Sequence, residues 1–312
     1  MDVLSDVIAI MRTGEPRSAR VEWRAPWGQQ FPSAPGSAGF QVILQGTSWL
    51  LPPTGPPVPL SAGDVLFFPH GHGYAMADSP STPVAEPQCD PAEIGDLFVS
   101  DSIAGTGPAT VLLCGGYRLD PARTHPLLRD LPEVIHLPAG PGLPAELRAA
   151  VDLLGAEVHR PKLGAGSVVL ALLDMLLLFI LRAWFTAEHG RCEVTGWAAA
   201  LADPDVSAAL DAMHRDPAHP WSVAELGARA GLSRAAFARR FAALVGQPPL
   251  AYLTWWRLST AGRLLRETDA PLSRIAGQVG YGSEYAFANA FKREYGLAPG
   301  KYRRAASAPP QA

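Results

Sequence analysis

A repeated segment near the carboxyl end restricts the fold of this 312-residue chain more than any other feature of its sequence. The stretch SVAELGARAGLSRAAFARRFAALVGQPP begins at Ser222, and LSRIAGQVGYGSEYAFANAFKREYGLAP begins at Leu272. Glycines and apolar residues match between the two at an offset of 49 and, after one inserted residue, at an offset of 50. Self-similarity at a fixed spacing indicates that one supersecondary unit forms twice.

The first copy predicts two helices joined by a glycine turn. Ser222 is a suitable N-cap, and Glu225 three residues later completes a capping box. Gly231 can adopt the positive φ that ends a helix, and Ser233 can cap the helix that follows. A short helix, a turn with glycine and a second helix together form a helix-turn-helix.

The second helix of this copy has an apolar face and a basic face. Phe237 and Phe241 lie four residues apart and are predicted to pack inward. The opposite face is predicted to enter the major groove of DNA. That face carries Arg234, Ala235, Ala238 and Arg239.

The segment Leu250–Glu267 between the copies predicts a linker helix about 27 Å long. Such a helix can hold two DNA-reading heads near the ~34 Å spacing of successive major-groove faces. The charge distribution agrees, because residues 214–304 hold 14 lysines and arginines against 6 acids, whereas residues 1–213 hold 12 against 23. A basic segment on an acidic body favours a nucleic-acid partner over a structural adaptor.

Three motifs in this region are characteristic of one family. They are AELGARAGLSRAAFARRF, the linker YLTWWRLSTAGRLLRET, and IAGQVGYGSEYAFANAFKREYG followed by PGKYRR. Residues 221–304 therefore resemble the DNA-binding domain of the AraC/XylS family of transcription regulators. The resemblance implies a sequence-specific regulator that binds double-stranded DNA. Members are commonly activators, which would make RNA polymerase a further partner.

The resemblance also assigns DNA contacts to both copies. Arg239 is expected to contact a base edge, because arginine pairs with guanine through two hydrogen bonds. Asn289 stands where members of the family often have arginine, and asparagine can pair with adenine. Lys292 and Arg293 are expected to contact phosphates. The expected DNA-binding residues are Arg234, Ala235, Ala238, Arg239, Arg240, Glu284, Tyr285, Asn289, Lys292 and Arg293.

The amino-terminal half predicts a β domain preceded by a short amphipathic helix over Asp2–Met11. Between residues 20 and 138, short apolar runs are bounded by glycine, proline, serine and aspartate, which is typical of strands in an antiparallel sandwich or barrel. These runs are Phe40–Leu44, Ser48–Leu51, Asp64–Phe68, Leu97–Val99 and Thr110–Cys114.

The stretch GDVLFFPHGHGY resembles the second motif of the cupin family, with Gly63, Pro69 and Gly71 in their expected places. Together with PWGQQFP and LLCGGYRLD, it makes residues 1–213 similar to the cupin-type sensor half of one branch of the same regulator family. Tyr74 stands where the motif has a histidine ligand, and Gln41 stands near the place of the first histidine. The chain is therefore expected to hold no metal or cofactor and not to be an enzyme. The alternative is a metal-dependent cupin enzyme with an accessory helical domain.

Five residues of the β domain are candidates for sensing a signal. His70 and His72 could share a strand face and form a metal site with Cys114, or with His125 or His136, or they form an exposed or backbone-bonded pair in a loop. Cys114 is either a small buried apolar side chain or an oxidant-sensing thiol. Tyr74 and Trp27 either line an effector cavity or belong to the core.

Two long helices are predicted over Leu143–His159 and Ser167–Glu188. The second is apolar on nearly every face and must be covered, so we expect the pair to form a homodimer interface. The apolar run Val168–Phe185 contains Asp174 and Arg182, which disfavours a membrane span.

Cysteine usage favours the reducing cytoplasm, because Cys89, Cys114 and Cys192 form neither an even disulfide framework nor a CxxC pair. The N-terminal residues also lack the basic flank of a signal peptide. We expect a multidomain α+β regulator that senses a small-molecule or redox signal. Its predicted parts are a cupin-like barrel or sandwich (1–140), a helical dimerisation segment (141–216), an all-α domain with two helix-turn-helix units (217–304) and a disordered tail (305–312).

Overall fold

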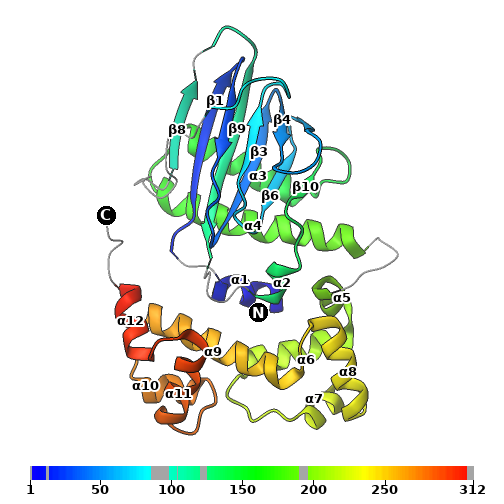
Figure 1. Cartoon of the computed structure of the whole chain (residues 1–312), viewed down its shortest axis with the longest axis vertical. Coiled ribbons are helices and arrows are strands. Elements are labelled where there is room, and N and C mark those ends of the chain that lie inside the picture. The colour runs from blue at the N-terminus through cyan, green and yellow to red at the C-terminus, as the bar shows by residue number, and fades with distance from the viewer. Residues whose placement is uncertain are drawn as a thin grey trace. The chain divides into compact units, whose positions relative to one another are not determined.

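The computed structural model describes residues 2–11, 14–85, 98–103, 105–119, 125–189 and 196–307. The chain divides into two compact units (Figure 1). The β unit consists of Arg12–Thr124 and Leu128–Gly190. The helical unit consists of Met1–Met11, His125–Leu127 and Arg191–Ala312. Cys89 and Cys192 lie outside the described residues.

The larger sheet of the β unit has six strands in the order β10-β6-β3-β9-β1-β8. Neighbouring strands are antiparallel except β1 and β8, which pair in parallel. The prediction of a purely antiparallel sheet is therefore wrong for this pair. The register of β3 against β9 shifts between Ile43 and Gln45. The bounds are β1 Arg17–Arg24, β3 Ser37–Gln45, β6 Val65–Phe68, β8 Phe98–Ile103, β9 Ala109–Arg118 and β10 Ile135–Leu137.

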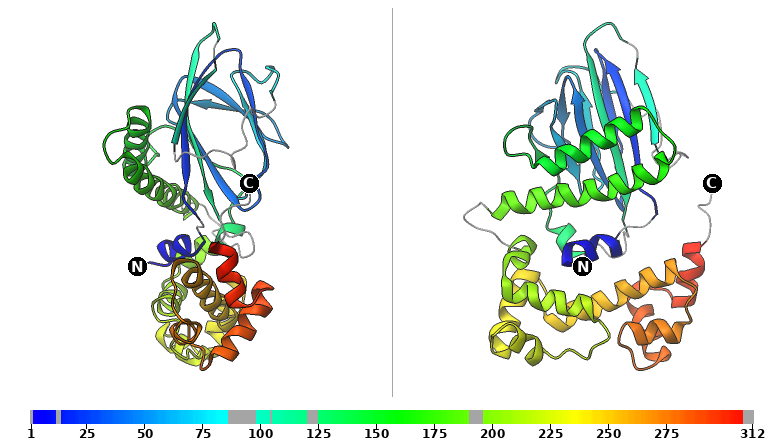
Figure 2. Two further views of the ribbon diagram at one scale, coloured as in Figure 1. Left: turned by 90° about the vertical axis from the view of Figure 1, so that its left-hand side faces the viewer. Right: turned by 180° about the vertical axis from the view of Figure 1, so that it is seen from behind.

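The smaller sheet has four antiparallel strands in the order β2-β7-β4-β5. Figures 1 and 2 show that the two sheets face each other, which is the predicted sandwich or flattened barrel. The bounds are β2 Gly28–Phe31, β4 Thr47–Leu51, β5 Val58–Ser61 and β7 Tyr74–Ala77.

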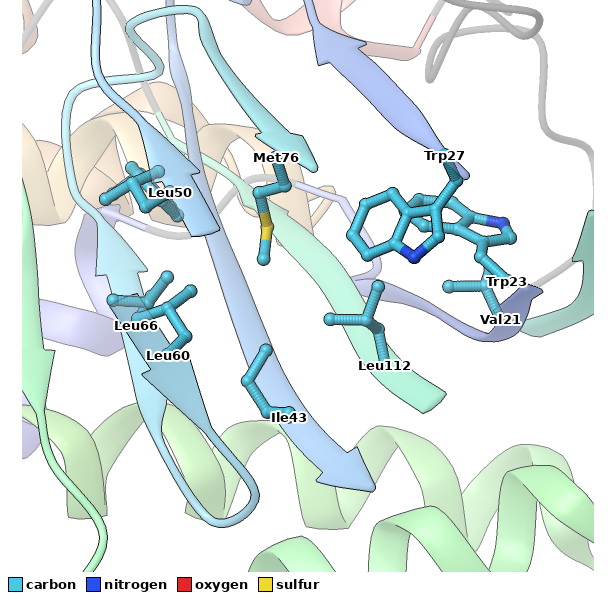
Figure 3. Close-up of a cluster of buried hydrophobic side chains, with 10 residues drawn as sticks. Val21, Trp23, Trp27, Ile43, Leu50, Leu60, Leu66, Met76 and Leu112 are labelled. Carbon is cyan, nitrogen blue, oxygen red and sulfur yellow. The ribbon is translucent and has the colours of Figure 1, made fainter. Parts of the chain in front are cut away.

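The core of the β unit lies between these sheets. Alternate residues of each strand point inward, because successive side chains of a strand face opposite sides of its sheet. In Figure 3, Trp23 and Trp27 lie against each other, while Ile43 and Leu112 come from neighbouring strands of the larger sheet. The buried cluster is Val21, Trp23, Trp27, Ile43, Leu50, Leu60, Leu66, Phe68, Met76 and Leu112.

Helices α3 (Ala145–His159) and α4 (Ala165–His189) cover the outer face of the larger sheet (Figure 2). The Tyr117 hydroxyl of β9 donates to the Leu173 carbonyl of α4 at 2.7 Å. The α4 helix is long and apolar enough to cross a bilayer by length and composition, and half of its apolar window is buried inside the protein. Such burial is typical of a helix that packs on a core.

The helical unit is organised around the long helix α9 (Figure 1). In one half of the unit, α6 and α7 pack against α8, and α8 contacts α9. In the other half, α10, α11 and α12 contact α9. Its bounds are α5 Gly196–Ala202, α6 Pro204–Arg215, α7 Val223–Arg229, α8 Arg234–Val245, α9 Pro249–Glu267, α10 Leu272–Gln278, α11 Glu284–Tyr295 and α12 Pro299–Ser307. Residues 305–307, which were predicted to belong to a disordered tail, thus continue α12.

The helical unit also includes two segments from the amino-terminal half of the chain. Helix α1 (Val3–Met11) packs on α6 and α9, and its apolar side chains Val3, Val7, Ile8, Ile10 and Met11 are buried. The second segment is His125–Leu127, at the start of the short helix α2 (Pro126–Arg129). The observed units therefore differ from the predicted domain ranges, because burial of α1 against α6 and α9 joins segments that are distant in sequence.

Candidate nucleic-acid interface and barrel core

Two helix-turn-helix heads have matched local geometry. We call α7 and α8 the first head, α10 and α11 the second head, and α8 and α11 the recognition helices. Ser233 and Ser283 each cap a recognition helix by accepting a hydrogen bond from the backbone N–H three residues later, at 3.3 and 3.2 Å. Each helix ends at a left-handed glycine, Gly246 with φ 80° and Gly296 with φ 71°, a conformation that favours glycine.

The recognition helices are also anchored in the same way. The ring centroids of Phe237 and Phe241 lie 5.6 Å apart, and those of Phe287 and Phe291 also lie 5.6 Å apart. All four rings are fully buried. Because caps, ends and anchors coincide, residues fifty positions apart occupy equivalent places on the two helices.

The predicted capping box of α7 forms only in part. Ser222 accepts a hydrogen bond from the backbone N–H of Glu225 at 3.1 Å. The Glu225 carboxylate does not return to the Ser222 backbone but contacts Nε2 of His219 at 2.9 Å. His219 thus supplies a competing partner for Glu225 that the capping-box spacing did not reveal.

The first recognition helix exposes Arg234, Ala235 and Arg239, while Ala238 is half-buried. These are positions at which DNA contacts were expected. A guanidinium group can donate two parallel hydrogen bonds to guanine or to a phosphate, and an alanine methyl can contact thymine. The face is therefore chemically suited to DNA.

Arg240 differs from the expectation that it serves DNA. Its Nε donates to Oδ2 of Asp203 at 2.7 Å, and its Nη1 lies 3.6 Å from Oδ2 of Asp205. Asp203 also caps α6 by accepting from the backbone of Asp205 and Val206. Although burial raises the pKa of Asp203, the bonds from Val206 and Arg240 hold that pKa below its ordinary value. Arg240 thus joins the first recognition helix to α6.

The second recognition helix exposes a different set of groups. Glu284 and Asn289 are exposed, and Tyr285 is 79 % exposed, which is unusual for so large a ring. Lys292 and Arg293 are exposed near the end of the helix. The positions equivalent to Arg234 and Arg239 of the first head thus carry an acid and an amide.

Helix α9 holds the heads through a buried polar cluster that was not predicted. Tyr252 and His214 are buried among aromatic rings, and the His214 ring stacks on Trp256 with centroids 3.5 Å apart. Arg257 donates to the carbonyl oxygens of Pro217 and His219 at 2.6 and 2.8 Å, which fixes the loop before α7. Sequence spacing gave no signal for these contacts, because the partners lie on different helices.

In the barrel core, the two residues at the expected cupin ligand positions contact each other. Gln41 Nε2 donates to the Tyr74 hydroxyl at 3.0 Å. The Tyr74 ring stacks on Phe68 with centroids 3.7 Å apart and on Phe31 with centroids 4.8 Å apart. Burial raises the pKa of Tyr74, and the Gln41 bond only partly offsets this, so the phenol stays neutral. A neutral phenol and an amide do not replace the imidazole ligands of a metal site.

The side chains of His70, His72 and Cys114 do not come together as ligands of one metal ion. The His70 and His72 rings lie 5.6 Å apart, and His70 Nε2 bonds the Leu131 carbonyl at 2.9 Å, so that nitrogen carries a proton. The half-buried Cys114 Sγ donates to the Ala19 carbonyl at 3.5 Å. Across the described ranges, no three histidine, cysteine or acidic side chains gather as a metal site would require. Trp27 is buried in the core.

Comparison with known proteins agrees with both halves. The cupin family pattern matches residues 2–186, and a helix-turn-helix domain pattern matches residues 226–305. A putative AraC-like transcription regulator of Streptomyces antibioticus is 36 % identical over 309 residues, covering 97 % of this chain and 99 % of the relative. The HTH-type transcriptional regulator MtrA of Neisseria gonorrhoeae is 29 % identical over 97 % of this chain and 98 % of its own length.

Among solved structures, the DNA-binding domain of AdpA in complex with a target DNA is 36 % identical, covers 33 % of this chain and 92 % of that domain, and gives a TM-score of 0.31. Two helix-turn-helix heads on one linker helix, joined to a cupin barrel, define a DNA-binding transcription regulator. The full-length match is equally specific. The chain belongs to the AraC-like transcription regulators, and its amino-terminal half belongs to the cupin family.

Proposed function

We propose that this regulator is a one-component switch, in which the β unit senses a small-molecule or redox signal and thereby alters DNA binding by the helical unit. One observation carries the proposal: a pair of geometrically matched DNA-reading heads belongs to the same chain as a barrel whose usual metal positions hold Gln41 and Tyr74. A barrel built this way suits binding or sensing rather than metal catalysis, so we propose that the chain is not an enzyme.

The proposed DNA contacts follow from the exposed faces of the recognition helices. Arg239 would read guanine, and Asn289 would read adenine, through paired hydrogen bonds in the major groove. Arg234, Lys292 and Arg293 would contact phosphates, which position the protein without specifying sequence. Ala235, Ala238, Glu284 and Tyr285 complete the surface proposed to face DNA.

We propose that the regulator binds as a homodimer through α3 and α4. These helices expose apolar side chains on the side that the sheet does not cover, including Leu153 at 57 % and Met175 at 44 %. Exposed apolar groups on neighbouring helices favour a protein interface. Val168 of α4 is also exposed, and so is Leu163 in the loop between the two helices.

In the cell, we place the protein in the cytoplasm, bound to DNA and not to a membrane. An activating role would bring RNA polymerase to the promoter, as the family resemblance implies. Because Cys114 is half-buried rather than fully buried, oxidation of its thiol is the second proposed form of input, besides binding of a small organic molecule.

The test is binding of the purified protein to its own upstream DNA and to a scrambled duplex, across a salt series. Tighter binding to the upstream duplex at every salt concentration supports the regulator, whereas equal binding that persists after selection from random DNA contradicts it. Repeating the titration with hypochlorite, on the wild type and on Cys114→Ser, separates the inputs. A shift that the variant loses indicates redox sensing, and an unchanged affinity points to an organic effector.

A further inference from the structure

The inner face of the larger sheet carries a cation and two glycines in one row. In the register of the strands, Arg17 of β1 pairs with Gly116 of β9, and Gly116 pairs with Gly39 of β3. Gly39 in turn pairs with Phe68 of β6, which belongs to the core between the sheets. All four therefore lie on the inner face, and the middle of this row has no side chains.

The glycines leave room in that row. A methyl group placed on Gly39 would meet only the Gly115 carbonyl at 3.7 Å and the Tyr74 hydroxyl at 4.0 Å. One placed on Gly116 would meet only the Ala38 carbonyl, at 3.1 Å. Among the described residues, the Tyr74 hydroxyl is the one side-chain group within 4 Å of either position, so their side chains do not fill this part of the barrel as they fill a protein core.

The next inward-facing row, two residues further along each strand, carries two polar side chains. Ala19 of β1 pairs with Cys114 of β9, and Cys114 pairs with Gln41 of β3. Gln41 is 2 % exposed and holds the Tyr74 hydroxyl through Nε2, while its Oε1 has no hydrogen-bond partner in the described part of the chain. An amide, a phenol and a thiol thus lie directly behind the glycine row.

Arg17 brings an unused donor to the same place. Its Nη1 is buried and has no hydrogen-bond partner among the residues that the structure describes. Buried polar groups in proteins nearly always have a hydrogen-bond partner, and a charged guanidinium nitrogen is among the costliest to bury without one. An inward-facing arginine with a free buried nitrogen calls for an acceptor that the chain itself does not supply.

A wall of aromatic rings borders this row, with Phe68 and Trp23 on the larger sheet and Phe31 and Tyr74 on the smaller sheet. Phe68 and Tyr74 stack with an interplanar angle of 4°, and Tyr74 and Phe31 stack at 15°. Phe31 continues to Trp23 with centroids 6.4 Å apart, and Trp23 to Trp27 at 4.8 Å. Because Phe68 and Phe31 stack on Tyr74, a flat apolar ligand would meet ring edges of this wall, an arrangement that aromatic groups also favour.

We propose that the barrel binds a small aromatic carboxylate, with its carboxylate on Arg17, its ring beside Tyr74 and Phe31, and a polar substituent within reach of Gln41. The inference rests on the proposed sensory role of the β unit and names the class of signal. A carboxylate fits better than a neutral ligand, because a buried guanidinium is best satisfied by a paired negative charge. A cationic ligand is excluded by the same charge.

The experiment is calorimetric titration of the full-length protein, without DNA, with benzoate, salicylate, phenylacetate and cinnamate to about 10 mM, a range set by the affinity available to so few atoms. At least one acid is expected to bind, and its neutral amide to bind roughly 10- to 100-fold more weakly. Arg17→Gln is expected to lose binding by a similar factor, and Arg17→Lys to recover part of it, because lysine keeps the charge but not the two-pronged geometry.

Arg20→Gln is the matched control, since Arg20 lies on the same strand but on the opposite face of the sheet, and it should bind like the wild type. Thermal unfolding of each variant shows whether it is folded. The proposal is overturned if no aromatic acid binds, if acid and amide bind equally, if Arg17→Gln and Arg20→Gln behave alike, or if sulfate and phosphate bind as well as the acids. Because the titration contains no DNA, its failure leaves the DNA-binding result standing.

Discussion

Nε2 of His214 lies 2.6 Å from the hydroxyl oxygen of Tyr252, at the buried centre of the helical unit. On the other side of the same hydroxyl, Nε2 of His125 lies 3.3 Å away. The Leu127 backbone donates to Nδ1 of His125 at 2.9 Å, so the proton of that ring is on Nε2. The Tyr252 hydroxyl oxygen therefore accepts from the Nε2–H of His125, and its O–H donates to Nε2 of His214. Nδ1 of His214 faces Oδ2 of Asp6 at 3.4 Å.

Removing the Tyr252 hydroxyl should destabilise the helical unit. Tyr252→Phe removes the hydroxyl that bonds both imidazole rings and leaves Nε2 of the buried His214 without its hydrogen-bond donor, so we expect a loss of about 1–3 kcal/mol in the free energy of unfolding. Urea denaturation of the full chain, with hydrogen exchange followed on α9, measures the loss. Tyr285→Phe is the control, because that ring is exposed and its change should stay within about 0.5 kcal/mol. Equal effects in the two variants would contradict the role of this cluster.

The stability of the helical unit should fall in mild acid because of His214. Burial lowers the pKa of His214 below 6.5, and the Asp6 carboxylate offsets only part of the decrease. Below pH 6.5 the unfolded chain takes up a proton that the folded ring resists, so the free energy of unfolding decreases as pH falls. Protonation also removes the acceptor for the Tyr252 O–H. In His214→Gln this contribution is absent, and its stability should depend less on pH as the pH falls below 6.5. Parallel profiles for the two proteins would rule it out.

The two kinds of DNA contact should separate under mutation. Arg239→Ala is expected to cost about 1–3 kcal/mol at the specific site and to relax the base preference there. Lys292→Ala should weaken specific and scrambled DNA alike and reduce the salt slope by about 1. Titration of both duplexes at several salt concentrations measures the two effects. The assignment of Arg239 fails if its variant keeps the wild-type ratio of specific to non-specific affinity.

Arg240 should behave unlike its neighbour. Because it is bound to Asp203, Arg240→Ala is expected to leave the salt slope of DNA binding unchanged. Asp203→Ala should destabilise the helical unit by about 1 kcal/mol, since it removes the N-cap of α6 as well as the partner of Arg240. A reduced salt slope in Arg240→Ala would show that this side chain leaves Asp203 to contact phosphate.

The proposed homodimer can be tested at the exposed apolar face of α3 and α4. Leu153→Lys and Met175→Lys place charges where apolar contacts are proposed, so the mass from light scattering should fall by about half. Asp152→Lys changes the charge at an exposed neighbour of Leu153 and should leave the mass unchanged. A monomeric wild type would disprove dimerisation through this face.

The repeat and the alternating strands were predictable because their signals are local. The offset of 49 and 50 residues correctly indicated two heads, and the spacing of Phe237 and Phe241 correctly indicated their buried faces. The replacement of cupin ligands at Gln41 and Tyr74 was likewise visible in the motif, although their hydrogen bond was not.

Long-range contacts were not predictable from one sequence. Asp6 and His214 lie on helices separated by the whole β unit in the chain, and no spacing links them. Arg240 has the same local pattern as a solvated basic residue, and only the fold places Asp203 beside it. The inner row at Arg17 depends on strand register, which alternation alone does not fix.

The recognition helices share a scaffold yet differ in what they expose, with Arg234 and Arg239 on one and Glu284 and Asn289 on the other. Under the proposed contacts the two heads read different bases, so each site that the protein binds has a polarity. Inverting a site within a promoter would turn the bound molecule around and exchange the surfaces that face upstream and downstream.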